Sequence, residues 1–304
     1  MDYNRFKEEV LRELKEKHGD VMEKIRVTLV KKTNGVEYEG VVFRPKGAGG
    51  IVVAPVLPLD TAYKAYTRGK ADAAVCAEAL WKEYEQNKGN RELQQFAGNL
   101  DRWDFVKKNV YPILLLAEGN RELLSGLVSV PLLDLAVVFI IRGKISDAGC
   151  SSVKITDAML KEYGATRQEL YDAAMANMKN DGYVFENMDD LIGDILKQKG
   201  FKDTGMDMLG VKEMYGLSNS SRLYGAAGIL DRKLVREFAN GRNMYILPSS
   251  VHEMIFVLAS DRYSVTELNR TVADINELQV AVEERLTDHC YFYDAEKDEI
   301  RMEP

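Results

Sequence analysis

The stretch PSSVHE at positions 248–253 places two hydroxyls, an imidazole and a carboxylate within six residues. A serine hydroxyl becomes a nucleophile when a neighbouring histidine takes its proton and a carboxylate orients the imidazole. Ser249 or Ser250 could form such a set with His252, and the tail aspartates Asp288 and Asp294 could supply the carboxylate. The stretch is therefore compatible with a hydrolase.

The same stretch also has the composition of a polar turn between two apolar runs. Neither serine has the flanking glycines of the GxSxG nucleophile elbow. The residue four positions after His252 is Phe256, so the HExxH zinc pattern is absent. We therefore favour a surface turn that faces a binding partner, and we keep a hydrolase built around Ser250 and His252 as the alternative. The contact residues predicted in this turn are Ser249, Ser250, His252 and Glu253.

A second polar stretch, LSNSSRLYGAAG, occupies positions 217–228. Small residues at the start of a helix can bind an anion through backbone amides, and Arg222 would add positive charge. The stretch lacks the GxxxxGK[ST] and GxGxxG patterns of nucleotide sites, so we predict that Gly225 and Gly228 pack tightly against a neighbouring element. Binding contacts are predicted at Ser218, Asn219 and Arg222.

Histidine is scarce, since the chain has only His18, His252 and His289. His18 ends a charged helix that we expect at the surface. His289 precedes an aromatic segment, in a position that favours a capped turn residue over a general base. Any acid–base chemistry by histidine would therefore need His252 or His289.

Composition argues against several classes of function. The chain has 304 residues and a net charge of −7, and no Lys/Arg stripe is interleaved with aromatic residues. Nucleic acid is therefore not the expected partner, because phosphate binding requires a basic surface. Cys76, Cys150 and Cys290 lie far apart and match no zinc spacing. The sequence predicts no metal, no cofactor and a reducing, cytoplasmic location.

No membrane segment is expected. The N-terminal residues MDYNRFKEEVLRELKEK contain no apolar core of a signal peptide. The longest apolar run, VPLLDLAVVFII at positions 130–141, has twelve residues and includes Asp134. A membrane-spanning helix needs about 20 apolar residues, so this run is too short.

Residues 1–108 are predicted to form an α+β region that begins with a helix and a β-hairpin. Apolar residues at spacings of three and four indicate the helix, namely Tyr3, Phe6, Val10 and Leu14. Strands are expected at 25–30 and 36–43, joined by the turn Thr33-Asn34-Gly35, and at 51–56. Helices are expected at 72–87 and, with interruptions, at 91–108. Trp81 and Trp103, with Tyr84 and Phe105, are predicted to attach these helices to the core.

Residues 109–304 are predicted to form a larger mixed α+β domain in which two stretches, 109–180 and 209–304, follow the same order of elements. Each has a strand, a helix, two more strands and a closing helix. The closing helices begin with capping boxes at Thr166–Glu169 and Ser264–Glu267. A degenerate tandem duplication would explain this order. We favour the other explanation, in which two α+β units share a common motif order.

Two more helices and a hairpin complete the predicted elements. One helix begins at Asn187 and stops at Gly200, and the other begins at Asp231 and stops at Asn240-Gly241. The tail, 290–302, suits a final hairpin with a polar turn at 294–298.

Several segments together resemble a bacterial domain-of-unknown-function family common in gut-dwelling anaerobic Gram-positive bacteria and often found near mobile elements. They are PLLDLAVVFII, ITDAMLKEYGATRQELYDAAMANM, YGLSNSSRLYGAAGIL, MYILPSSVHEMIFVL and TDHCYFYDAEKDEIRM. The resemblance implies a cytoplasmic accessory protein of bacteria or their mobile elements, and it assigns no catalytic residue. Together with the residue analysis it favours a non-enzymatic module that binds a protein or a small molecule.

Overall fold

The computed structural model describes residues 2–47, 55–88, 90–146, 149–187, 214–260 and 263–303. Contacts divide the chain into two compact units, Met1–Leu100 and Asp101–Pro304. Both combine helices with antiparallel sheet, so the predicted α+β class is confirmed. Among the helices in the described ranges, none has the length and apolarity needed to cross a membrane.

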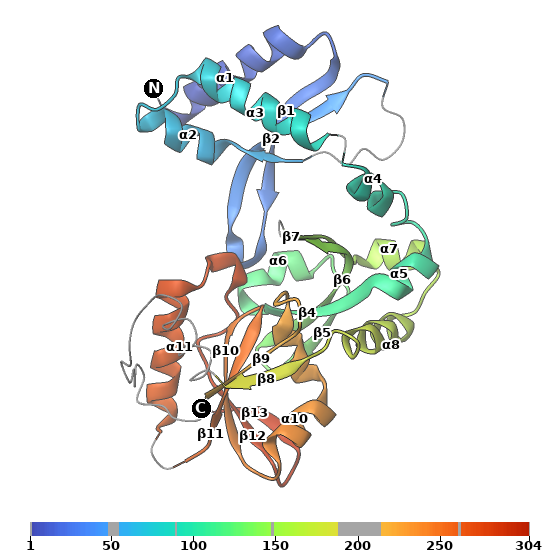
Figure 1. Cartoon of the computed structure of the whole chain (residues 1–304), viewed down its shortest axis with the longest axis vertical. Coiled ribbons are helices and arrows are strands. Elements are labelled where there is room, and N and C mark those ends of the chain that lie inside the picture. The colour runs from blue at the N-terminus through green and yellow to red at the C-terminus, as the bar shows by residue number, and fades with distance from the viewer. Residues whose placement is uncertain are drawn as a thin grey trace. The chain divides into compact units, whose positions relative to one another are not determined.

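The first unit is a three-stranded antiparallel sheet covered by helices (Figure 1). Its core lies between the sheet and α1 and α3, which pack side by side. Fully buried aromatic rings at its centre include Phe6, Phe43 and Tyr84. The elements are α1 (Tyr3–His18), β1 (Met22–Lys31), β2 (Glu37–Pro45), β3 (Leu57–Pro58), α2 (Leu59–Thr67), α3 (Ala73–Asn87) and α4 (Arg91–Ala97).

Local sequence signals locate most of these elements correctly. The buried residues of α1 are Phe6, Val10 and Leu14, as the helical spacing predicts. Asn34 has a φ of 57° in the short 3₁₀ turn between β1 and β2, a left-handed conformation that asparagine tolerates well. The predicted hairpin is therefore confirmed. The strand expected at 51–56 falls mostly outside the described residues, and α2 was not predicted.

The second unit contains a four-stranded and a six-stranded antiparallel sheet (Figure 1). In the smaller sheet the long strand β6 pairs with β4 along one edge and with β5 and then β7 along the other. The strands are β4 (Val110–Leu116), β5 (Ser129–Leu132), β6 (Leu135–Ser146) and β7 (Gly149–Lys154). The helices are α5 (Trp103–Asn109), α6 (Arg121–Leu124), α7 (Asp157–Glu162) and α8 (Arg167–Met178).

The larger sheet has the strand order β13-β12-β10-β11-β9-β8. Helix α11 packs on β10, and a 3₁₀ segment, η3 (Gly225–Leu230), packs on β9, β11 and β4. The strands are β8 (Val184–Asn187), β9 (Met214–Ser218), β10 (Met244–Ser250), β11 (Glu253–Leu258), β12 (Tyr291–Asp294) and β13 (Glu299–Met302). The remaining helices are α10 (Arg232–Ala239) and α11 (Val265–Gln279). The helix predicted after Asn187 lies outside the described residues.

The two stretches with similar element order pair their strands differently. In the first, the leading strand β4 pairs with the next strand of the pattern, β6. In the second, the leading strand β9 pairs with the last strand of the pattern, β11. The two stretches therefore share an order of elements and differ in strand connectivity.

Both predicted capping boxes are present. Thr166 Oγ1 accepts from the Glu169 N–H at 3.2 Å, and Glu169 Oε2 accepts from the Thr166 N–H at 2.8 Å. Ser264 and Glu267 make the same reciprocal pair of bonds. The Thr166 hydroxyl also donates to Glu169 Oε2 at 2.8 Å. The bonds from the backbone N–H and the hydroxyl of Thr166 together hold the pKa of Glu169 below its usual value.

This lowered pKa predicts a pH-dependent contribution of Glu169 to stability. A carboxyl whose pKa is depressed in the folded state stabilises the fold above its unfolded pKa, and this stability is lost as the pH falls through the folded value. Glu169→Gln keeps a neutral acceptor. Wild type should therefore be more stable than the variant at about pH 7, and the difference should shrink as the pH falls to about 2. Urea denaturation at both pH values measures it, with Glu162→Gln as the exposed control. A difference that persists at the lower pH would contradict the prediction.

Candidate functional site

The two polar stretches singled out in the sequence meet in the second unit. The Ser218 hydroxyl, at the end of β9, donates to the carbonyl oxygen of His252 at 2.8 Å. The Tyr224 backbone N–H donates to Nδ1 of His252 at 3.2 Å. We call the exposed and partly exposed side chains at this junction the Tyr224–His252 surface; they are Ser220, Arg222, Tyr224, His252 and Glu253.

Both ring nitrogens of His252 have partners. Since Nδ1 accepts from Tyr224, a neutral imidazole carries its proton on Nε2. Nε2 lies 3.3 Å from a carboxylate oxygen of Glu284. The Ser250 hydroxyl accepts from the backbone N–H of His252 at 3.2 Å and does not bond the ring. The imidazole is therefore held between a loop backbone and a carboxylate, an arrangement that fixes its position.

The tail aspartates considered for a hydrolase are engaged elsewhere. Asp288 Oδ1 accepts from the Asn276 side chain at 2.7 Å. Asp294 Oδ1 accepts from the backbone N–H groups of Glu296 and Lys297. The carboxylate nearest the His252 ring is instead Glu284, from the turn that precedes β12. A serine, a histidine and a carboxylate therefore lie close together here, but among the described residues no hydrogen bond joins the Ser250 hydroxyl to the His252 ring as in a serine hydrolase.

Three of the residues predicted to contact a partner are buried. Ser218, Asn219 and Ser250 are 3%, 2% and 8% exposed, which corrects the expectation that they face outward. The reason is that backbone groups satisfy them: Asn219, for example, donates to the Leu223 carbonyl and accepts from the Leu223 N–H. These buried side chains hold the backbone of the Tyr224–His252 surface in place.

Arg222 and Glu253, two further predicted contact residues, are exposed and partly exposed. Arg222 is 51% exposed and pairs with Glu186 of β8. Glu253 is partly exposed at the start of β11, and Ser249 lies in β10.

The loop that carries Arg222 and Tyr224 has an unusual backbone. Arg222 and Tyr224 have φ values of 55° and 58°, in the left-handed region that side chains other than glycine, asparagine and aspartate seldom adopt. Bonds from Asn219 and His252 hold both residues there. The Tyr224 ring stacks on the His252 ring with centroids 5.7 Å apart. The loop is therefore rigid at the cost of local strain.

Tight glycine packing, predicted for this stretch, is confirmed. A Cβ added to Gly225 would lie 2.3 Å from Ser218 Oγ and 2.5 Å from the His252 carbonyl oxygen. A Cβ added to Gly228 would lie 2.5 Å from the ring of Tyr183. The first glycine thus allows the two polar stretches to come together.

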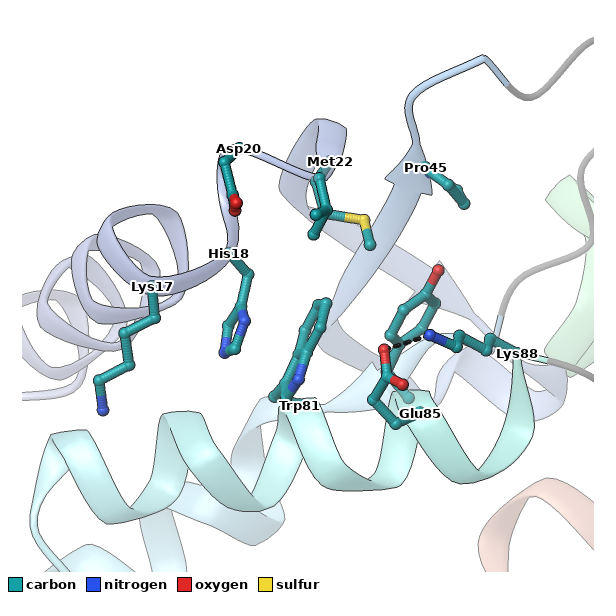
Figure 2. A pocket seen from close by; sticks show the side chains of 10 residues that line it. Lys17, His18, Asp20, Met22, Pro45, Trp81, Glu85 and Lys88 are labelled. Carbon is teal, nitrogen blue, oxygen red and sulfur yellow. Dashed lines mark hydrogen bonds and ion pairs between the residues drawn. The ribbon is translucent and has the colours of Figure 1, made fainter.

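A separate cleft of about 510 Å³ lies in the first unit, between α3 and the segment that joins α1 to β1 (Figure 2). Figure 2 shows His18 and Trp81 side by side, and their rings are parallel, with centroids 3.6 Å apart. The sequence interpretation missed this cleft and placed His18 on an exposed helix end. A signal existed, since Trp81, Glu85 and Lys88 recur at spacings of four and three along α3.

The model of a family of unknown function, DUF5688, matches residues 3–295. The chain belongs to the DUF5688 family. Searches of curated proteins and of solved structures found no match. The resemblance to a family of unknown function is thereby confirmed, and bacterial origin and an association with mobile elements stay proposals.

This DUF5688 protein also brings together a threonine, a histidine and an aspartate. The Thr287 hydroxyl donates to Asp134 at 2.6 Å, and His289 Nδ1 lies 3.4 Å from the same carboxylate oxygen. The buried Tyr291 hydroxyl also donates to Asp134, and burial with this bond raises the pKa of Tyr291. The Thr287 oxygen also lies 3.2 Å from His289 Nδ1. Through these contacts the group joins the β5–β6 turn to β12. The His289 N–H donates to Thr287, in keeping with the expected turn role.

We predict that this DUF5688 protein folds without metal or disulfide. Among the described residues no three His, Cys, Asp or Glu side chains form a group that could hold a metal ion. Cys76, Cys150 and Cys290 are free thiols. A chelator and a reductant, added separately, should therefore leave the melting temperature unchanged within error. A fall of several degrees with the chelator would contradict the prediction.

Proposed function

We propose that this DUF5688 protein is a non-enzymatic binding module whose protein partner contacts the Tyr224–His252 surface. The observation that carries the proposal is the engagement of both His252 ring nitrogens, by the Tyr224 N–H and by Glu284. A general base must have a nitrogen available to the proton that it takes. At this site the polar groups of His252 stabilise a loop instead.

The residue types and the fixed backbone of this surface favour binding to a partner. Arginine and tyrosine often dominate the energy of protein interfaces, and a rigid surface loses little entropy when it binds. Arg222 and Tyr224 are held in a strained conformation by buried Asn219 and by His252. Strained backbone of this kind is more frequent at functional sites than elsewhere, so the outlier favours a functional surface.

We further propose that the protein works in the bacterial cytoplasm, as an accessory protein of bacteria or of their mobile elements. The three free cysteines suit a reducing compartment. The net charge of −7 favours a protein partner over nucleic acid.

Comparative affinity capture tests the proposed surface. Wild type and the double variant Arg222→Glu/Glu253→Arg are used as baits in a lysate of the native host. The double variant Lys233→Glu/Glu237→Lys is the matched control, because it exchanges an exposed ion pair on α10. A partner should be enriched by wild type and by the control and reduced about tenfold or more by the surface variant. Equal enrichment by all three baits would contradict the proposal that the partner contacts this surface.

A substrate screen tests the alternative of a hydrolase. Wild type and His252→Ala are incubated with generic ester, peptide and phosphoester substrates. We expect no turnover above buffer for either protein. Turnover by wild type that falls roughly a thousandfold in His252→Ala would establish the hydrolase and replace the binding proposal.

A further inference from the structure

We propose that the cleft of the first unit binds an organic cation, an amine with an apolar body. The cleft is formed by residues of the first unit, so this inference is independent of the proposed function of the Tyr224–His252 surface. Three properties of the cleft lead to it: its apolar lip, its fixed aromatic floor and the sign of its unneutralised charge.

The cleft offers apolar area at a suitable size. A volume of about 510 Å³ falls within the range of about 300–1,000 Å³ that small-molecule sites occupy. Its apolar lip includes Met22 and Pro45, which lie above Trp81 in Figure 2, and Val21 also lines the cleft. Val21 is 49% exposed, so a ligand body that covers it would remove apolar surface from water.

The aromatic floor is held in place before any ligand arrives. The Trp81 indole is stacked on His18, and it also packs against Phe43 and Tyr84 with centroids 5.5 Å and 5.3 Å apart. The stack leaves the Nε2 atom of His18 buried without a hydrogen-bond partner in the described residues. Such a nitrogen destabilises the fold, so the stack is maintained against a penalty. An unpartnered buried polar atom calls for an explanation, and a ligand that uses the stack supplies one.

The charge left unneutralised in the cleft is negative. Four charged side chains line it: Lys17, Asp20, Glu85 and Lys88. Lys88 is paired with Glu85, and Lys17 lies within 4.0 Å of Glu13 and of Glu78. The Asp20 carboxylate itself has no hydrogen-bond or ion-pair partner among the residues that the structure describes, while the Lys46 ammonium donates to the Asp20 backbone carbonyl at 2.7 Å. An ammonium group would therefore find its counter-ion at Asp20.

A negatively charged ligand would fit this cleft less well than a cation. A carboxylate or phosphate would meet the negative charge of Asp20 and would have to displace a glutamate from Lys17 or Lys88. A cation beside Asp20 also gains from nearby aromatic rings, since Trp and Tyr attract cations. Charge and apolar area together thus specify a cationic amphiphile.

Three probes that share a phenyl ring and differ in charge test the proposal. Phenethylamine, 2-phenylethanol and 3-phenylpropionate are titrated into the full chain, and binding is followed by ligand-detected nuclear magnetic resonance. We expect saturable binding of the amine, at least about tenfold tighter than that of the acid, with the alcohol between them. Equal affinity for amine and acid, or no binding of the amine up to about 10 mM, would overturn the proposal.

Substitutions then locate the site. Asp20→Lys should weaken amine binding about tenfold or more, because it reverses the charge that attracts the ammonium. Val21→Ser should weaken it about threefold through lost apolar contact. Glu16→Lys makes the same change of net charge on the exposed face of α1 and should bind like wild type. Unchanged affinity in Asp20→Lys would place the amine elsewhere and refute the proposal.

Discussion

Replacing Arg142 with alanine should lower the free energy of unfolding by about 3–5 kcal/mol, because it leaves a buried carboxylate without its partner. Arg142 lies in β6 and is 8% exposed, and Asp181, after α8, is 12% exposed. The guanidinium donates to both carboxylate oxygens, at 2.7 Å and 2.6 Å. It also lies over the Tyr111 ring at 3.4 Å. The Asp181 carbonyl oxygen in turn accepts from the Ser220 N–H, so this pair connects β6 to the loop of the Tyr224–His252 surface.

Urea denaturation measures this effect against a surface pair. Arg44 and Glu23 form an ion pair at 2.9 Å with both side chains about half exposed. Arg44→Ala should therefore cost no more than about 1 kcal/mol. The double variant Arg142→Met/Asp181→Leu should recover much of the loss, since it removes both buried charges. A cost for Arg142→Ala similar to that for Arg44→Ala would contradict the prediction.

Gly225→Ala should destabilise the second unit by about 3 kcal/mol, at the upper end of the usual cost of overpacking. The added methyl would lie within 3.0 Å of three atoms, one each from Ser218, His252 and Asn219. Two of these are backbone atoms, the His252 carbonyl oxygen and the Asn219 nitrogen, and they cannot rotate away. The clash should also separate the two polar stretches, so partner capture should fall together with stability.

Gly126→Ala is the matched control. A Cβ at Gly126 would have no atom within 4 Å, and its φ lies outside the left-handed region. The variant should change stability by less than about 1 kcal/mol, since alanine mainly restricts the unfolded chain. Equal effects of the two substitutions, measured by thermal and urea unfolding, would show that the close approach at Gly225 does not constrain the fold.

Features set by neighbouring residues could be predicted from the sequence. Both capping boxes depend on contacts three residues apart, and the hairpin turn depends on Asn34-Gly35. The cap of α10 at Asp231 and its left-handed end at Asn240 were identified in the same way. Strands β5 and β8 were not predicted. Each has four residues and no clear alternation, so only pairing with β6 and β9 defines them.

The contacts of the candidate site could not be predicted for the same reason, because they join residues that are far apart in the chain. The residue types around Ser218 and His252 indicated two polar stretches, yet the contact between them spans 34 positions in the chain. Burial of Ser218, Asn219 and Ser250 follows from that contact and was therefore not visible locally. Likewise Asp134 and Thr287 are 153 positions apart, and one lies inside an apolar run.

The stacking of His18 on Trp81 also has an optical consequence. The chain has two tryptophans, and each compact unit contains one of them. Trp81 emits from within an imidazole stack, whereas Trp103 lies against the ring of Tyr163, with centroids 5.8 Å apart. Because indole fluorescence responds to the groups that touch the ring, the two residues should give distinguishable signals. Trp103→Phe and Trp81→Phe would each leave a single emitter, so the melting of one half of the protein could be observed without the other.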